Sequence, residues 1–353
     1  MRVAAFTRYS RQAASTRQRL LQYLPSLREA GIEVEDHALL DDDYVRSLAS
    51  GEPYPPTRVA RAYIDRMRQL IASRDADVLW VYVELFPYLP ALVEQLATRG
   101  KRVVYDMDDA FFHHYDDSEN PLLRGLLGGK HGKLMTHAAA CTCGNEYLRE
   151  YVSRYCPKTI VLPTVVDTNV YRPVTRTASG PAVIGWIGSP TTWPNVRPLF
   201  PLLRELCAGG GVVVRVVGAG AMAERDRFPG LELVDWSEET EVTEVQRMDI
   251  GIMPLADSPF ERGKSGYKLI QYMACGLPAV ASPVGVNRTI LADGVSGYLA
   301  TTQAEWREAL TRLIADPGLR RRMGEQGRQR VEASYSLDSQ APRLIELLRQ
   351  VAA

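Results

Sequence analysis

Length, composition and charge place this chain among ordinary globular proteins. Its 353 residues suggest about two domains, and a hydrophobic content of 46% with 24% charged residues allows sizeable buried cores. Lysine plus arginine and aspartate plus glutamate number 42 each, so the overall charge gives no reason to expect nucleic acid as a partner, and any anion binding must be local.

No segment has the pattern of a membrane span or a signal peptide. The apolar run at residues 2–7 is short and lacks a cleavage site, and no uncharged stretch approaches the roughly 18 residues that a span requires. We therefore expect a cytoplasmic protein. The cysteines are odd in number and should be reduced and mostly buried: Cys141, Cys143, Cys156, Cys207 and Cys275.

The first half of the chain alternates predicted strands with predicted helices. The strands are expected at 2–7, 32–38, 77–83, 102–105, 136–143 and 159–162, and the helices at 17–30, 59–73 and 89–99. A polar stretch rich in Pro, Thr and Ser follows between Asp167 and Pro181, which predicts a linker.

A second alternating series follows the linker. Its strands are expected at 183–187, 212–217, 231–234, 250–253 and 279–281, its helices at 196–208, 240–247, 267–275 and 303–315, and a closing helix at 337–351. Two such series predict an α/β fold with two Rossmann-like parallel-sheet domains, 1–172 and 182–335, facing a central cleft. Residues 336–353 would form a C-terminal helix that can pack back on the N-terminal domain.

The most informative segment runs from Gly263 to Pro283. Glycines bracket Lys264 and Ser265, and Gly266 precedes an amphipathic helix that contains Lys268 and ends at Gly276. A helix N-terminus with backbone amides and two ammonium groups supplies the chemistry that holds a diphosphate.

Three turns after strands of the second half add to this pattern. Gly188 lets a backbone approach a ligand, and Ser189 and Thr191 either donate to phosphate or cap the next helix; Gly218 follows the next strand, and Trp236 ends a third. The alternative for Trp236 is simple packing. Because these turns should meet at one sheet edge, we interpret them together as a nucleoside-diphosphate site.

The segments 184–191, 249–255, 263–282, 283–287 and 293–299 resemble the family-4 retaining glycosyltransferases, and the resemblance extends over nearly the whole chain. It implies the two-domain GT-B architecture and transfer of a sugar from a nucleoside-diphosphate donor with retention at the anomeric carbon. It also implies no metal and no cofactor, with UDP the favoured donor nucleotide and GDP the next.

The chain departs from the family pattern in one place. Many members carry two glutamates separated by seven residues, and here Gly263 and Gln271 stand at these positions. Gln271 would still bind the donor ribose, and Glu261 would replace the first glutamate if the loop is re-routed. The turn after the first strand of the second domain, residues 189–195, contains no basic residue. Lys264 and Lys268 must therefore stabilise the diphosphate.

Asp106, Asp108 and Asp109 follow a strand and allow several interpretations. In the glycosyltransferase interpretation, Asp106 and Asp108 contact the sugar or the acceptor. In a phosphatase of the haloacid-dehalogenase type, Asp106 would be a Mg²⁺-dependent nucleophile, although Ala110 replaces the usual threonine. The remaining alternative is a turn and helix cap.

The acceptor side is indicated only weakly. Arg8 and Arg11, with Arg17 and Arg19, surround the first strand-to-helix turn, and Asn145 resembles a cleft residue of the family or acts as a helix N-cap. The acceptor would be a glycan, a lipid-linked molecule or a small molecule, and the basic residues leave open a peripheral contact with the inner membrane face. A protein that binds nucleotide sugars without transferring them is the non-enzyme alternative.

Overall fold

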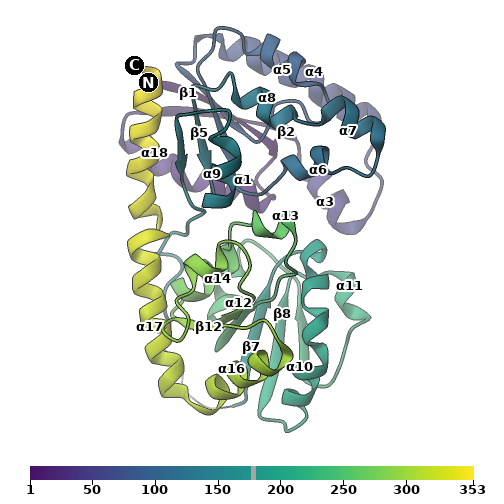
Figure 1. The fold of residues 1–353 in the computed structure, drawn as a ribbon, viewed down its shortest axis with the longest axis vertical. Coiled ribbons are helices and arrows are strands. Elements are labelled where there is room, and N and C mark those ends of the chain that lie inside the picture. Colours follow the sequence, from purple (N-terminus) through teal and green to yellow (C-terminus); the bar gives the residue numbers. More distant parts are fainter. Residues whose placement is uncertain (176–179) are drawn as a thin grey trace. The chain divides into compact units, whose positions relative to one another are not determined.

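The structure is a computed structural model, and it describes residues 1–175 and 180–353 (Figure 1). Residues 176–179 of the expected linker lie outside this description. The chain divides into two compact units: unit 1 comprises residues 1–164, 262–265 and 337–353, and unit 2 comprises residues 165–261 and 266–336.

Unit 1 contains a six-stranded parallel sheet in the order β2-β1-β3-β4-β5-β6. The strands are β1 (Arg2–Tyr9), β2 (Glu33–Leu40), β3 (Val78–Tyr82), β4 (Val103–Met107), β5 (Ala140–Cys143) and β6 (Thr159–Val161). The helices are α1 (Ala14–Arg19), α2 (Leu24–Glu29), α3 (Asp42–Ser50), α4 (Pro56–Ala72), α5 (Ala91–Ala97), α6 (Phe112–Asp116), α7 (Pro121–Leu127), α8 (Lys130–Met135), α9 (Glu146–Val152) and α18 (Leu337–Ala352), with 3₁₀ turns η1 (Leu21–Tyr23) and η2 (Ser73–Asp75). Every residue of β3 and β4 is buried, as their apolar sequences predict.

Unit 2 contains a second six-stranded parallel sheet, in the order β12-β11-β10-β7-β8-β9. The strands are β7 (Ala182–Ile187), β8 (Val212–Val217), β9 (Leu231–Val234), β10 (Ile250–Met253), β11 (Ala279–Ala281) and β12 (Gly297–Leu299). The helices are α10 (Phe200–Cys207), α11 (Ala221–Glu224), α12 (Glu241–Gln246), α13 (Pro259–Arg262), α14 (Tyr267–Ala274), α15 (Asn287–Ile290), α16 (Gln303–Ala315) and α17 (Pro317–Ser334), with 3₁₀ turns η3 (Pro190–Asn195) and η4 (Arg197–Leu199).

Two expected helices are wrong in their extent. The segment 17–30 is not one helix, because Leu20 leaves the helical conformation (φ −124°, ψ −66°) and a new helix, α2, begins at Leu24 with Pro25 in its first turn. The segment 196–208 starts as 3₁₀ turns, and α10 begins only at Phe200. The elements that were not predicted are the helices α3, α6 to α8, α11, α13, α15 and α17 and the strand β12.

The last helix, α18, belongs to unit 1 and contacts α2, η1 and β3. Arg349 donates a hydrogen bond to the Ala30 carbonyl at 2.7 Å, and Arg102 donates one to the Ala352 carbonyl at 2.5 Å. These bonds fix the end of the chain on the first sheet. None of the helices in the described residues combines the length and apolar character that crossing a bilayer requires.

Candidate donor-binding site

The turns that follow β7, β8 and β9 meet at one edge of the unit 2 sheet. Gly218 has a left-handed backbone (φ 79°), and a Cβ there would lie 2.3 Å from the Gly188 carbonyl oxygen and 3.0 Å from the Trp236 Cβ. The two turns therefore touch only because position 218 lacks a side chain. The expected meeting of these turns is present in the structure.

Lys268, in the first turn of α14, reaches this edge. Its ammonium lies 5.5 Å from the centre of the buried Trp186 ring, and a Cβ on Gly188 would lie 2.8 Å from the Lys268 Cε. The half-buried ammonium thus stands beside the Gly188 turn and at the positive end of a helix. This combination can stabilise a phosphate group.

Gly266 sets the start of α14. Its φ is 68°, and a Cβ there would lie 2.3 Å from the Ile290 Cδ1, so glycine is required on both conformational and steric grounds. Beside the Gly188 turn, Ser189 and Thr192 form a capping box on η3, and the exposed Thr191 hydroxyl lies 2.9 Å from the Ser189 hydroxyl. Ser189 acts here as a helix cap, which is one of the two roles considered for it.

Gln271 is buried, with 3% of its surface exposed, and lies in a polar network. Its Nε2 donates to the Glu241 Oε1 at 2.8 Å and to the Tyr171 hydroxyl at 3.0 Å. Trp236 Nε1 donates to the other Glu241 oxygen at 2.6 Å, and the Tyr171 hydroxyl also donates to Glu241. Glu241, which sequence reasoning missed, is therefore the centre of this network.

The segment with Lys264 and Ser265 belongs to unit 1. The Asn145 side chain caps α9 by accepting from the Leu148 amide at 3.0 Å, and its Nδ2 donates to the carbonyls of Gly263 (2.8 Å) and Lys264 (3.1 Å). Gly263 is buried, and a Cβ there would lie 2.4 Å from the Ala110 Cβ. Asn145 thus orders the backbone on which the half-buried Lys264 and Ser265 side chains sit.

Glu261 is half-buried in α13, in unit 2, and its amide donates to the Ser258 hydroxyl at 3.3 Å. Its proposed role as the first glutamate stays a prediction.

Asp106 lies in the interior of unit 1. Only 1% of it is exposed, and its carboxylate accepts two hydrogen bonds from Arg19, at 2.9 and 2.5 Å, and a third from the Thr142 hydroxyl. Arg19 is equally buried and also donates to the Leu162 carbonyl. This geometry makes Asp106 and Arg19 a structural ion pair, which removes both from our candidate substrate contacts and leaves the phosphatase alternative without an accessible nucleophile.

Asp108 is also buried, and it accepts a hydrogen bond from the Tyr82 hydroxyl at 2.6 Å. Burial, and then the neighbouring Asp109 charge, raise the pKa of Asp108 to about 7. Arg11 is exposed on the loop before α1, whereas the Arg8 guanidinium lies over the rings of Tyr9 (5.3 Å) and Tyr88 (5.7 Å). Arg8 thus packs against tyrosine rings, and the acceptor-side roles expected for Arg8 and Arg11 stay predictions.

Comparisons with known proteins show which families and folds this chain is similar to. Residues 181–316, which form most of unit 2, match the family described as glycosyl transferases group 1. The alpha-maltose-1-phosphate synthase of Mycobacterium tuberculosis is 24% identical over 340 residues, covering 85% of this chain and 87% of that protein. The D-inositol 3-phosphate glycosyltransferase of Streptosporangium roseum is 30% identical over 142 residues, which cover 39% of this chain and 27% of that protein.

Two solved structures are similar over nearly their whole length. The sucrose-phosphate synthase of Thermosynechococcus elongatus has a TM-score of 0.76 at 16% identity, covering 99% of this chain and 98% of that chain. The HepE protein of Anabaena, solved with UDP-glucose, has a TM-score of 0.75 at 14% identity, covering 99% and 100%. The chain therefore has the α/β GT-B fold, and it is a glycosyltransferase enzyme.

Proposed function

We propose that this glycosyltransferase is a retaining member of family 4 that takes its sugar from a UDP-sugar without a metal ion, with GDP as the second candidate nucleotide. The observation that carries the proposal is the Lys268 ammonium beside the Gly188 turn, at the N-terminus of α14. A fixed ammonium and a helix N-terminus supply positive charge where the diphosphate leaves. In other enzymes a metal ion stabilises the negative charge of the leaving diphosphate. The UDP complexes of the HepE protein support the choice of uridine.

In this proposal each residue of the candidate donor site has its own role. Lys268 stabilises the departing diphosphate, and Lys264, four residues earlier in the chain, is the second cation. The Gly188 turn, with Ser189 and Thr191, approaches the phosphates, and Trp236 beyond Gly218 borders the base. The network of Gln271 and Glu241 presents polar groups to the ribose hydroxyls.

Retention would follow from attack of the acceptor on the same face of the sugar from which the diphosphate departs. In that step the acceptor oxygen forms the new bond to the anomeric carbon as the bond to the diphosphate oxygen breaks. The acceptor proton passes to a leaving phosphate oxygen. A stable sugar adduct on an aspartate of this chain would contradict this route.

A thermal-shift screen tests the proposal, because a ligand that binds only the folded state raises the melting temperature. UDP, GDP, ADP and TDP, each with Mg²⁺ and with EDTA, are the ligands. We expect UDP to stabilise the protein equally in both conditions. Proton NMR of the product made from a UDP-α-sugar should then show an α-linkage; a β-linkage would exclude retention.

A further inference from the structure

A cavity of about 610 Å³ lies within unit 1 and takes no part in the donor site. Residues from α3, from the loop between α3 and α4, from the first half of α4 and from the loop after β3 line it: Tyr44, Ser47, Leu48, Glu52, Tyr54, Pro56, Val59, Ala60, Tyr63, Pro87, Tyr88 and Leu89. Both α3 and this loop follow the carboxyl ends of strands, β2 and β3, which is the edge of a parallel sheet where ligands bind. Its volume is that of a site for a small organic ligand.

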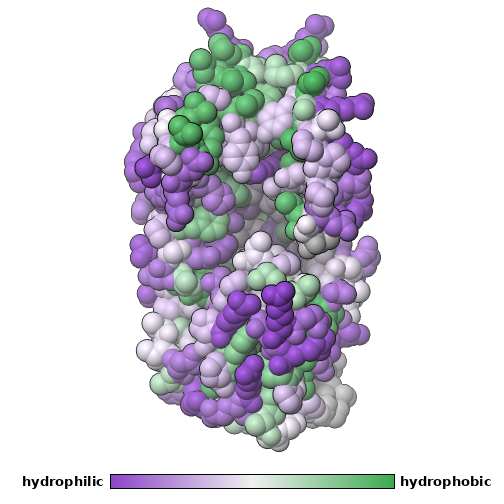
Figure 2. Space-filling view, turned by 90° about the vertical axis from the view of Figure 1, so that its right-hand side faces the viewer, coloured by the Kyte–Doolittle hydropathy of each residue, from purple (hydrophilic) through white to green (hydrophobic). Residues whose placement is uncertain are grey.

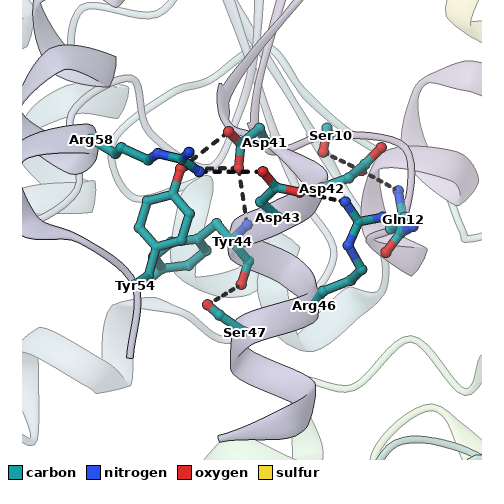
Figure 3. A network of polar contacts seen from close by, with 10 residues as sticks. All are labelled: Ser10, Gln12, Asp41, Asp42, Asp43, Tyr44, Arg46, Ser47, Tyr54 and Arg58. Carbon is teal, nitrogen blue, oxygen red and sulfur yellow. Dashed lines mark hydrogen bonds and ion pairs between the residues drawn. The ribbon is translucent and has the colours of Figure 1, made fainter. Parts of the chain in front are cut away.

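One wall of the cavity is fixed by a carboxylate (Figure 3). Asp41 caps α3 by accepting from the Tyr44 amide at 2.9 Å, and both of its oxygens lie 3.1 Å from the Tyr54 hydroxyl. The Tyr44 and Tyr54 rings meet edge to face at 5.0 Å. The two rings are thereby held in place without a ligand.

The opposite wall is held by a buried polar network. Tyr88 has a left-handed backbone (φ 61°), and its amide donates to the Tyr115 hydroxyl at 3.0 Å. That hydroxyl donates to Glu84 at 2.9 Å, and Glu84 pairs with Lys130 at 2.5 Å in the interior. A non-glycine residue in this conformation is strained, and such strain is commonest where a loop is built to hold a ligand.

The chemistry of the lining favours an apolar group. Rings and aliphatic side chains predominate, and two hydroxyls are already engaged, since Tyr54 donates to Asp41 and Tyr63 donates to the Pro87 carbonyl at 2.6 Å. Of the twelve described residues that line the cavity, none is a lysine or an arginine, and the one charged residue among them, the exposed Glu52, would repel a phosphate. The rim also exposes apolar surface, because Leu48 and Tyr88 are 58% and 57% exposed.

Figure 2 faces the side on which α3 and α7 are drawn in Figure 1 and shows hydrophobic side chains exposed there among hydrophilic ones. We propose that this cavity binds an aryl or alkyl group of the acceptor, so that the enzyme glycosylates a molecule with an apolar aglycone. This inference rests on the proposed function and adds the substrate class. It also separates this chain from a transferase whose acceptor is a bare sugar phosphate.

Calorimetric titration with three glucosides tests the inference: 4-nitrophenyl, octyl and methyl α-glucoside. They share the sugar and differ in the apolar group, so the first two distinguish an aryl from an alkyl occupant. We expect at least one of them to bind about tenfold or more tightly than methyl glucoside. Equal binding of all three would overturn the proposal.

Two alanine-to-tryptophan variants on α4 test whether the preferred glucoside binds in the cavity. Ala60 lines the cavity, whereas Ala72 lies exposed at the end of the same helix, outside the lining. Ala60→Trp should weaken binding of the preferred glucoside about tenfold or more, and Ala72→Trp should leave it unchanged. Binding unaffected by Ala60→Trp would contradict the assignment. UDP binding by both variants should stay normal, so its absence would count against the donor proposal and not against the cavity.

Discussion

The side-chain amide of Gln271 donates a hydrogen bond to the Glu241 carboxylate across 2.8 Å. Gln271 occupies the position where the family that this chain resembles carries a glutamate. Because Glu241 already supplies a carboxylate there, a second one would meet it with like charge and without a bridging proton. The glutamine and the glutamate therefore form a matched pair.

Exchanging this pair tests the match. Gln271→Glu should lower the free energy of unfolding by about 1–3 kcal/mol at pH 8, because two carboxylates would face each other in a largely buried site. A proton held between the two carboxylates would relieve their repulsion, so the loss should shrink as the pH falls towards 5. The double variant Gln271→Glu with Glu241→Gln restores the donor and the acceptor and should recover most of the stability in urea unfolding. Failure of the double variant to recover would show that the network depends on more than this pair.

Asp106 should contribute to the stability of the folded protein and take no part in sugar transfer. Asp106→Asn breaks a buried ion pair and leaves Arg19 partly uncompensated, so we expect a loss of about 3–5 kcal/mol in denaturant unfolding. The exposed pair of Asp65 with Arg68, at 2.7 Å, serves as a control, and Asp65→Asn should cost less than about 1 kcal/mol. A folded Asp106→Asn variant that loses all transfer activity at normal stability would return Asp106 to the active site.

Glu94 should make the free energy of unfolding depend measurably on pH. It is completely buried, and burial raises its pKa to about 7 although it accepts hydrogen bonds from the Leu85 amide and the Tyr105 hydroxyl. The folded protein thus holds a proton that the unfolded chain has released, and stability falls as the pH rises from about 4.5 to 7.

Glu94→Gln removes this titration. Between these pH values the wild-type protein should lose about 3 kcal/mol relative to the variant. Glu146→Gln, at a carboxylate that is 65% exposed, should keep the wild-type slope. Parallel pH curves for the wild type and Glu94→Gln would mean that Glu94 is ionised in the folded protein.

Most strands could be predicted from the sequence, whereas the side-chain pairs between distant segments could not. The expected strands at 212–217, 231–234, 250–253 and 279–281 coincide with β8 to β11. Strands β10 and β11 are buried throughout and therefore apolar, whereas β8 and the edge strand β9 remain recognisable although they contain Arg215 and Glu232. Helix α3 was not predicted, although Asp41 is its cap and Asp42 and Asp43 lie in its first turn, which is a typical start of a helix. Strand β12 is as short as β11, but it lies at the edge of the sheet and two of its three residues are only partly buried, so it lacks the continuous buried apolar run that marks β11.

The candidate site likewise contains features that could be predicted from the sequence and features that could not. Local signals placed Gly188, Gly218 and Lys268 at one sheet edge, since turns after parallel strands meet there. Nothing local indicated that Asp106 would pair with Arg19, 87 residues away, or that Glu241 would join Gln271. Those pairings depend on the packing of distant segments, which a single sequence does not record.

Calorimetric titration of UDP into three proteins tests the central claim, that Lys268 stabilises the donor diphosphate without a metal ion. They are the wild type, Lys268→Met, and Lys158→Met, which removes an exposed lysine of unit 1 as a control. In EDTA we expect the wild type and Lys158→Met to bind UDP equally and Lys268→Met to bind it about tenfold or more weakly, a loss of about 1.4 kcal/mol. Equal binding by all three proteins, or binding that appears only with Mg²⁺, would contradict the account.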